Sequence, residues 1–395
     1  MKTIINNIGN KTLIFADTFE YEAYDQIKKL CNFEAYIDST IRIMPDAHAG
    51  KGCTVGTTMT ITNKITPNLV GVDIGCGMLS IKLKNKNIDF SKLDKVIKDK
   101  IPSGFDVHKN PQSKFKFSGL RCQKYVGLER ANLSIGSLGG GNHFIEIDQS
   151  ESGDLYLVIH SGSRKLGGDT CKYYQDKAFQ NANEMSKVVK NVVDKLKAEG
   201  REKEIPSEIK KIQKPMTDKD LAYLIGNDFD DYINDMAIVQ KFATLNRETM
   251  AKIILKEANL QESERFETIH NYIDFNRMIL RKGAVSAEAE ELLLIPINMR
   301  DGSLLCVGKG NENWNYSAPH GAGRVLSRSV AKKQLSMDTF KEQMKDIYST
   351  SVCNATLDEA PNVYKDCNMI EAAIEPTAII LGKSIPIINL KDKTV

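Results

Sequence analysis

The chain has 395 residues, of which 41% are hydrophobic and 27% charged, values ordinary for a soluble globular enzyme. No run of about 18 apolar residues occurs, which excludes a membrane span. The N-terminus lacks the apolar core of a signal peptide, so we expect a cytoplasmic protein. A net charge of +3 provides no global basic field, so a nucleic-acid partner requires a local basic track.

The first half of the chain is predicted to be rich in short strands. A strand is expected at 11–15, followed by an amphipathic helix at 21–30. From 41 to 86, short apolar runs alternate with glycines, a pattern typical of strands with polar residues at their ends. The strands expected there are 41–45, 57–61, 69–74 and 78–83. Next come helices at 91–100 and 121–131 and strands at 144–147 and 155–159.

The second half begins with lysine-rich text in which apolar residues recur at helical spacing, which predicts a helical insertion or lid over 170–215. One or two long helices are expected within 219–258. The remaining elements are strands at 268–273, 279–286, 292–298, 303–307 and 376–381 and a helix at 338–347. We predict a single α+β domain over 1–395, with large mixed or antiparallel sheets in one compact body and peripheral helices.

Five of the six histidines lie in breaks rich in Gly, Asn or Ser at the ends of predicted strands, where the backbone can approach a ligand closely. They are His48, His143, His160, His270 and His320. One histidine after a strand is usually a hydrogen-bonded structural residue, but five in the same setting weaken that interpretation. Asp73 and Cys76 add a carboxylate and a thiol. Asp, Cys and His are ligands of transition metals, and this set alone favours zinc over manganese.

Simpler interpretations of the same residues stay open. Asp73 and Cys76 are also explained as a turn-capping carboxylate beside a buried thiol. The glycine-rich run at 136–142 is alternatively a phosphate cradle of backbone N–H groups. It is not a Walker A loop, because no Gly-Lys-Ser/Thr follows. None of the eight cysteines forms a CxxC pair, so no disulfide frame is expected. Cysteines predicted to be ordinary buried thiols are Cys53, Cys306 and Cys353.

Seven stretches together resemble one family, the RtcB-type RNA ligases, which are 3′-phosphate/5′-hydroxyl nucleic acid ligases. The stretches occur in family order and span roughly 41–391. They read PDAHAGKGCTVG at 45–56, GVDIGCGM at 71–78, GSLGGGNHFIE at 136–146, IHSGSRKLG at 159–167, IHNY at 269–272, SAPHGAGRVLSR at 317–328 and DEAPNVYKD at 358–366.

The resemblance implies an RtcB-like fold and a GTP- and Mn²⁺-dependent RNA ligase, which we expect to be a monomer. Such an enzyme joins 3′-phosphate or 2′,3′-cyclic phosphate ends of RNA to 5′-hydroxyl ends. The reaction proceeds through a GMP-histidine intermediate and an activated RNA 3′ end, and it serves RNA repair or tRNA splicing.

The resemblance also implies individual roles for residues of this chain. Asp73, Cys76 and His143 match the ligands of one Mn²⁺ ion. Cys76, His160 and His270 match those of a second, with the thiolate shared. His320 matches the nucleophile that becomes guanylylated. Positions matching those that hold the guanine nucleotide are Asn142, His143, Phe144, Ile145, Glu146, His270, Asn271, Pro296, Ile297, Asn298, Met299, Ser303, His320, Gly321, Ala322, Gly323, Arg324 and Lys391.

One segment departs from the family pattern, which has Pro-Gly-Ser-Met where this chain has Pro296-Ile297-Asn298-Met299. Asn298 can still hydrogen-bond a nucleotide, whereas Ile297 removes a glycine and crowds the backbone. Three rival functions remain: a metal-dependent cyclic phosphoesterase without ligation, a non-catalytic RNA-end-binding protein, and a zinc enzyme acting on small molecules. A covalent GMP adduct separates the ligase from the phosphoesterase.

A local track for RNA phosphates is predicted at Lys51, Arg164, Lys165 and Arg328, which lie in the same loop ends as the metal and nucleotide residues. The alternative is that these side chains form a solvated rim. If they form the track, the double change Arg164→Ala with Lys165→Ala weakens RNA joining while sparing GMP transfer to His320.

Overall fold

A computed structural model describes residues 2–5, 11–18, 20–212 and 218–393 of the chain. Its two large sheets are antiparallel apart from one parallel pair, β2 with β3. The six-stranded sheet has the order β1 (Lys2–Ile5), β2 (Lys11–Ile14), β3 (Ile41–His48), β4 (Val55–Thr60), β12 (Ile279–Lys282), β11 (Asn271–Asp274). The seven-stranded sheet has the order β10 (Glu262–Ile269), β6 (Gly77–Leu83), β8 (Leu155–Ser161), β7 (Phe144–Ser150), β17 (Ala378–Lys391), β15 (Gly302–Gly308), β14 (Leu292–Asn298).

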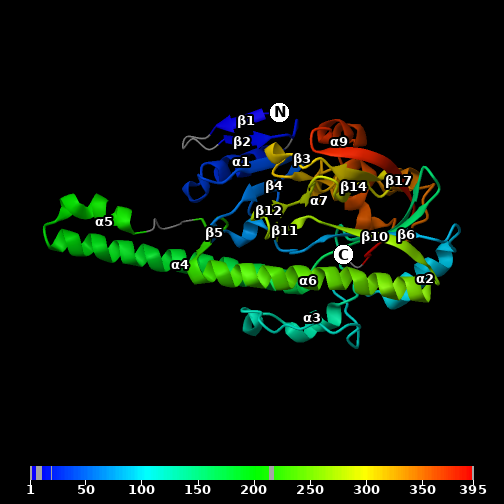
Figure 1. The fold of residues 1–395 in the computed structure, drawn as a ribbon, viewed down its shortest axis with the longest axis horizontal. Helices are drawn as coiled ribbons and strands as arrows, with labels where there is room; N and C mark the ends of the chain where they lie inside the picture. The colour runs from blue at the N-terminus through cyan, green and yellow to red at the C-terminus, as the bar shows by residue number, and fades with distance from the viewer. Residues whose placement is uncertain (1, 6–10, 19, 213–217, 394–395) are drawn as a thin grey trace.

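Helices surround the two sheets, and two short strand pairs complete the architecture (Figure 1). The strand pairs are β13 (Ala284–Ser286) with β16 (Ser317–Pro319), and β5 (Lys64–Ile65) with β9 (Leu224–Ile225). The helices are α1 (Tyr21–Cys31), α2 (Phe90–Lys100), α3 (Leu128–Ser134), α4 (Arg164–Ala198), α5 (Ile205–Lys211), α6 (Gly226–Glu257), α7 (Arg328–Gln334), α8 (Met337–Gln343) and α9 (Cys367–Ile374). No helix within the described ranges is apolar over a length that could cross a membrane. The predicted α+β fold class is confirmed.

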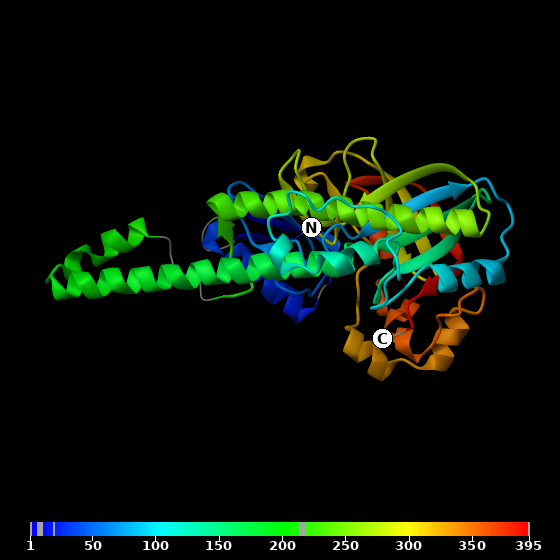
Figure 2. The ribbon, with the colours of Figure 1, turned by 90° about the horizontal axis from the view of Figure 1, so that it is seen from below.

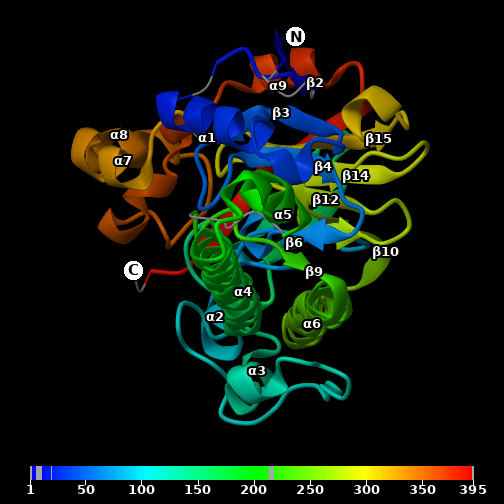
Figure 3. The same cartoon turned by 90° about the vertical axis from the view of Figure 1, so that its left-hand side faces the viewer.

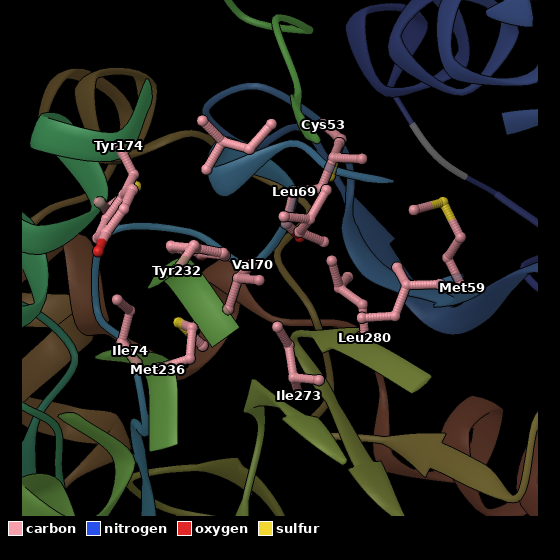
Figure 4. Close-up of a cluster of buried hydrophobic side chains, with 14 of the residues drawn as sticks. Cys53, Met59, Leu69, Val70, Ile74, Tyr174, Tyr232, Met236, Ile273 and Leu280 are labelled. Atoms are coloured by element: carbon pink, nitrogen blue, oxygen red, sulfur yellow. The ribbon is translucent and has the colours of Figure 1, made fainter. Parts of the chain in front are cut away.

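The largest hydrophobic cluster joins the six-stranded sheet to α4 and α6 (Figure 4). Met59 and Leu280 come from adjacent strands β4 and β12, while Tyr174 lies on α4 and Met236 on α6. These side chains are fully buried, which removes apolar surface from water, the main favourable contribution to folding. The cluster therefore fixes α6 against the sheets, and α6 later proves to anchor the site.

Helix α4 has 35 residues, which gives it a length of about 52 Å. Its first half packs against the body beside α6, and its second half extends away from it, with α5 folding back alongside (Figures 1 and 2). Figure 3 looks along this projection and shows α4 and α6 below the sheets. The described part of 170–215 begins on the half of α4 that packs against the body, where Tyr174 is buried, and continues along the projection. Its action as an insertion or lid stays a prediction.

The structure corrects several predicted elements. The apolar run 69–74 is not a strand. Leu69 ends a 3₁₀ turn, and a partly exposed loop follows, because Gly71 and Gly75 have positive φ values of 102° and 72°. The expected strand 268–273 divides at His270 into β10 and β11, which belong to different sheets. The expected strand 279–286 divides at Gly283, where φ is 60°. Helix 121–131 is reduced to a 3₁₀ turn and α3, and helix 338–347 to α8.

The sequence patterns also missed whole elements. Strand β1 and helices α7 and α9 were not predicted, and β17 continues to Lys391 although a strand was expected only at 376–381. Among the cysteines, Cys53 and Cys306 are buried as predicted, but the prediction for Cys353 was wrong because that residue is only partly buried.

Candidate metal and nucleotide site

The strand register of the seven-stranded sheet gathers the predicted metal ligands at one edge. Cys76 immediately precedes β6, and its neighbour Gly77 pairs with Ser161 of β8 on one side and Ile269 of β10 on the other. His160 of β8 pairs with Phe144, the residue after His143. His270 follows Ile269 directly. Four distant segments therefore meet because their strands are neighbours in the sheet.

The side chains form two groups that share one sulfur atom. The ligand atoms of Asp73, Cys76 and His143 lie within 4.8 Å of one another, and so do those of Cys76, His160 and His270. Cys76 Sγ is 3.5 Å from His143 Nε2 and 3.3 Å from His160 Nε2. His143 Nε2 is 2.9 Å from an Asp73 carboxylate oxygen, and the Nε2 atoms of His160 and His270 are 3.3 Å apart. These are the two sets that the resemblance implies.

Hydrogen bonds orient two of the imidazoles. His143 Nδ1 donates to the Leu138 carbonyl at 2.9 Å, and His160 Nδ1 donates to the Asn142 carbonyl at 3.3 Å. A carbonyl oxygen only accepts, so these contacts assign the proton to Nδ1 and leave Nε2 as a lone pair facing Cys76. Such a contact on the far ring nitrogen is the usual support of a metal-binding histidine.

Burial shifts the pKa values of two histidines and of the thiol in this cluster. Burial, reinforced by neighbouring histidines, lowers the pKa of His160 and His270 well below the usual range. Burial and the Asp73 carboxylate raise the pKa of the Cys76 thiol well above its usual range. Neutral imidazole is the form that binds metal. A metal cation beside the sulfur would lower the pKa of the Cys76 thiol again, because the cation favours the thiolate. The donor set therefore fits divalent transition-metal ions.

Two buried residues of α6, which sequence patterns did not single out, hold the loops that carry the ligands. Asn246 accepts hydrogen bonds from the backbone N–H groups of Gly136 and Ser137 and donates to the Gly162 carbonyl. Arg247 donates to the carbonyls of Gly75 and Ser161 at 2.7 and 2.5 Å. Both side chains are fully buried. The helix thus ties together the glycine-rich run, the Asp73–Cys76 turn and the end of β8.

The loop after β8 requires a glycine at position 162. A Cβ atom there would collide with the Asp73 carboxylate, which also accepts a hydrogen bond from the Ser163 backbone N–H at 3.2 Å. The carboxylate is therefore pressed against bare backbone and held in place beside His143.

A cavity of about 550 Å³ opens beside the metal-ligand cluster, a size suited to a small-molecule ligand. It is lined by most of the predicted nucleotide residues. Those on its wall are Asn142, Phe144, Glu146, His270, Pro296, Ile297, Asn298, Met299, His320, Gly321, Ala322, Gly323, Arg324 and Lys391. Four predicted residues lie outside the lining. His143 belongs to the metal-ligand cluster, Ile145 to the core, and Asn271 accepts from the Gly283 N–H; Ser303 is buried.

His320 is oriented by a buried carboxylate that sequence analysis did not assign. Its ring Nδ1 lies 2.6 Å from Asp46 Oδ2, and its backbone N–H donates to the same oxygen at 3.1 Å. In the neutral ring this contact places the proton on Nδ1 and leaves a lone pair on Nε2. The ring centroid is 5.0 Å from that of His270. His320 is therefore a fixed nucleophile candidate next to the metal ligands.

The loop after His320 packs tightly against Asp46. Gly323 has a φ of 76°, and a Cβ atom at this position would collide with the Asp46 backbone. The PHGAGR stretch and the PDAHAG stretch, far apart in sequence, are thus fitted to each other through a glycine.

A second buried carboxylate organises the cations of the cavity wall. Glu359 accepts from Tyr364 at 2.7 Å, from Arg328 at 2.7 Å and from Lys391 at 3.2 Å, and it pairs with Arg324 at 3.3 Å. Burial alone would raise its pKa, but Lys391, Arg328 and Arg324 lower the pKa of Glu359 to about 2. The DEAP stretch therefore presents three cations to the cavity in fixed positions.

The cavity wall also includes the side chains of Glu146 and Asn389. Glu146 accepts from Asn389 Nδ2 at 2.6 Å, and the Asp148 carboxylate accepts from Ser384. Among the described residues, Asn389 Oδ1, Asp148 Oδ1 and Ser303 Oγ have no hydrogen-bond partner although they are buried. Burial raises the pKa of Glu146, and that of Asp148 to about 7. Of these three residues, Asn389 alone lines the cavity. Because an unsatisfied buried polar group is costly, Asn389 Oδ1 marks a position suited to a polar ligand.

Comparison with known proteins identifies the chain. A family model described as tRNA-splicing ligase RtcB matches residues 26–126 and 121–392. RNA-splicing ligase RtcB1 of Escherichia coli strain ATCC 25922 is 31% identical over 380 residues, which cover 86% of each chain. The chain belongs to the RtcB family.

Two other RtcB proteins are also similar over most of their length. RNA-splicing ligase RtcB of Escherichia coli strain K12 is 30% identical over 380 residues, again 86% of each chain. The tRNA-splicing ligase RtcB of Aeropyrum pernix is 25% identical over 459 residues, which cover 91% of this chain and 90% of the relative.

The departure from the RtcB pattern at 296–299 has a local explanation. Ile297 is only 2% exposed and packs in the hydrophobic cluster between β14, β15 and α9, although it also borders the cavity. Asn298 accepts from the backbone N–H groups of Arg300 and Asp301 and donates to the Asp301 carboxylate. The amide of Asn298 therefore caps the turn between the two strands.

The residues predicted to form an RNA track in this RtcB chain are not equivalent. Lys51 lines the cavity, and Arg328 reaches into its wall at Asp358 and Glu359. Lys165 is exposed and pairs with Asp169. Arg164 instead points inward, with φ at 55° and bonds to Ser137 Oγ and the Gly104 carbonyl.

Proposed function

We propose that this protein is a GTP- and divalent-metal-dependent RNA ligase that joins a 3′-phosphate or 2′,3′-cyclic phosphate end to a 5′-hydroxyl end. Family membership supports RNA ligation, since the relatives are named RNA- or tRNA-splicing ligases. The observation that carries the chemistry is His320. It pairs with buried Asp46, lies 5.0 Å from the ring of His270 and lines the same cavity.

A 3′-phosphate lacks a good leaving group, so it must be activated before a hydroxyl can displace anything from it. In the proposed route, Nε2 of His320 attacks the α-phosphorus of GTP and expels pyrophosphate. The histidine-bound GMP then passes to the RNA 3′-phosphate, and attack by the 5′-hydroxyl releases GMP. Asp46 supports the first step because it stabilises positive charge that develops on the imidazole.

The remaining cavity residues bind the nucleotide in this proposal. Arg324, Arg328 and Lys391 lie where the phosphates need positive charge. Glu146 and the unsatisfied oxygen of Asn389 supply acceptors for the N–H groups of a guanine edge.

The two groups centred on Cys76 are proposed to hold two divalent ions, Mn²⁺ by resemblance to the family. Asp73 and His143 complete one site, and His160 and His270 complete the other. Bound there, the ions neutralise charge on phosphoryl oxygens. Thiolate and imidazole also suit zinc, so both metals belong in the test.

The deciding experiment incubates the protein with GTP labelled at the α-phosphate, in the presence of Mn²⁺ or Zn²⁺. We expect an acid-labile protein adduct that is absent from His320→Asn and a sealed product when RNA with matching ends is added. His320→Asn is expected to keep its metal content, which shows that the fold persists. Opening of cyclic phosphates without any adduct would identify a phosphoesterase instead.

A further inference from the structure

One histidine in the cavity has no part in the proposed steps. His48 is the last residue of β3, lines the cavity and is half-buried. Its ring lies 6.4 Å from that of His320, and the two planes differ by only 24°. The cavity is therefore lined by a further imidazole close to His320, and this imidazole has no role in the steps proposed above.

The same residue, Asp46, fixes both rings. His320 Nδ1 faces the Asp46 carboxylate, whereas His48 Nδ1 lies 2.9 Å from the Asp46 backbone carbonyl. A carbonyl only accepts, so the contact assigns the proton of His48 to Nδ1 and a lone pair to Nε2. Since both Nδ1 atoms point at Asp46, both Nε2 edges point away from it, on the side of the cavity that the rings line.

The loop that carries His48 is held from two sides. Gln26 donates to the Gly50 carbonyl at 2.7 Å and accepts from the Gly50 N–H at 3.1 Å. Lys365 Nζ donates to the carbonyls of Pro45 at 2.9 Å and Ala47 at 3.3 Å. These hydrogen bonds leave the half-buried ring of His48 little conformational freedom, as expected of a side chain that is positioned for function.

The charge of the His48 ring determines whether it can act as a proton acceptor or as a cation that binds phosphate. Burial lowers the pKa of His48 to about 4. The hydrogen bond to the Asp46 carbonyl and the Asp46 carboxylate raise this pKa in part, and His320 lowers it further. The ring is therefore neutral near pH 7 and accepts a proton instead of binding phosphate as a cation. Phosphates brought by nucleotide and RNA add negative charge to the cavity, which raises the basicity of a nearby imidazole in the complex.

We infer that His48 is the general base of the sealing step, accepting the proton of the RNA 5′-hydroxyl at Nε2. As the O–H bond breaks, the 5′ oxygen bonds to the phosphorus of the activated 3′ end. The bond from that phosphorus to the bridging oxygen breaks, GMP leaves, and the imidazolium returns its proton to GMP or water. The inference rests on the proposed function and adds a catalytic residue to it.

The test separates the two half-reactions by single-turnover measurement. One arm follows adduct formation from labelled GTP, and the other follows sealing of RNA already activated with GMP at its 3′ end. His48→Asn keeps a donor for the Asp46 carbonyl but lacks the lone pair. We expect sealing to slow by about 10²-fold or more and adduct formation to change by less than about threefold.

Imidazole rescue distinguishes a base from a structural ring. Sealing by His48→Ala is expected to recover by about tenfold or more with added imidazole. Gln26→Ala, which loosens the same loop, shows no rescue. Sealing by His48→Asn near the wild-type rate overturns the inference, as do equal losses in both arms or selective loss without rescue. A wild-type protein that forms adduct and seals RNA separates these results from failure of the proposed function, which removes both.

Discussion

Asn246→Ala is predicted to loosen the metal-ligand cluster from a distance, since Asn246 itself is not a ligand. Its carboxamide makes five hydrogen bonds: two N–H groups donate to it, and it donates to the Ser137 carbonyl, Ser161 Oγ and the Gly162 carbonyl. An unsatisfied buried group costs about 1–3 kcal/mol, and water entering the space left by the amide recovers part of this. Two stranded N–H groups therefore lower the free energy of unfolding by about 2–5 kcal/mol.

The same change should weaken metal binding at one group more than at the other. The loop released by Asn246→Ala includes Leu138, whose carbonyl orients His143, and Gly162, which packs against Asp73. We expect metal titration calorimetry to show a larger loss at the Asp73 group than at the His270 group, and urea unfolding to show the loss of stability.

Two variants of α6 sharpen this test. Asn246→Asp keeps the acceptor for the N–H groups but turns an oxygen toward two carbonyls, so it isolates the donor side. Asn234→Ala is the matched control, because Asn234 lies on the same helix and its amide bonds to the distant Gly119 carbonyl and to Asp235. A free energy of unfolding for Asn246→Ala within about 0.5 kcal/mol of wild type, or unchanged metal affinity, refutes the anchoring role.

Three further predictions follow from single contacts. Cys76→Ala is expected to lose both metal ions in elemental analysis, whereas Cys306→Ala keeps them; one ion retained contradicts a shared sulfur. The lowered pKa of Glu359 contributes about 3 kcal/mol of stability above its ordinary pKa of 4.5, and this stability is lost as the pH falls toward 2. Glu359→Gln should therefore show a smaller decrease in the free energy of urea unfolding between pH 5 and pH 3 than the wild type. Arg164→Ala is expected to reduce adduct formation and sealing together, because Arg164 holds the loop that contains Ser137. Lys165→Ala is expected to reduce sealing alone, because Lys165 is exposed. A loss of sealing alone in Arg164→Ala, or of both reactions in Lys165→Ala, contradicts these roles.

Sequence patterns singled out the residues of the two candidate metal-binding groups because they are rare residue types at strand ends. The sequence alone singles out Cys76, His160 and His270, without knowledge of the strand order. Their convergence follows from the register, in which β6 lies between β8 and β10. The supporting residues gave no comparable signal, because a polar residue such as Asn246 within a long helix resembles any exposed residue until the helix is seen to be buried.

The wrong strand at 69–74 shows the limit of hydrophobic runs. Leu69, Val70 and Ile74 are fully buried, as a strand would require, whereas Val72 is 45% exposed. The backbone departs from a strand at Gly71 and Gly75, where positive φ turns the chain so that Asp73 and Cys76 face the site. Burial of most of the segment explains its apolar residues. The positive φ values of its two glycines determine the path of the chain, which hydrophobicity alone does not predict.

The division of 268–273 at His270 has the same origin and bears on how the site works. β10 belongs to the seven-stranded sheet and β11 to the six-stranded sheet, so His270 lies where the chain passes from one to the other. Asp46 and His48 come from the six-stranded sheet, while Cys76 and His160 come from the other. His320, held by Asp46 and close to His270, therefore lies between the residues that the two sheets contribute to the site. Chemistry that needs both sides depends on the packing of the two sheets, which is why no short stretch of sequence contains the site.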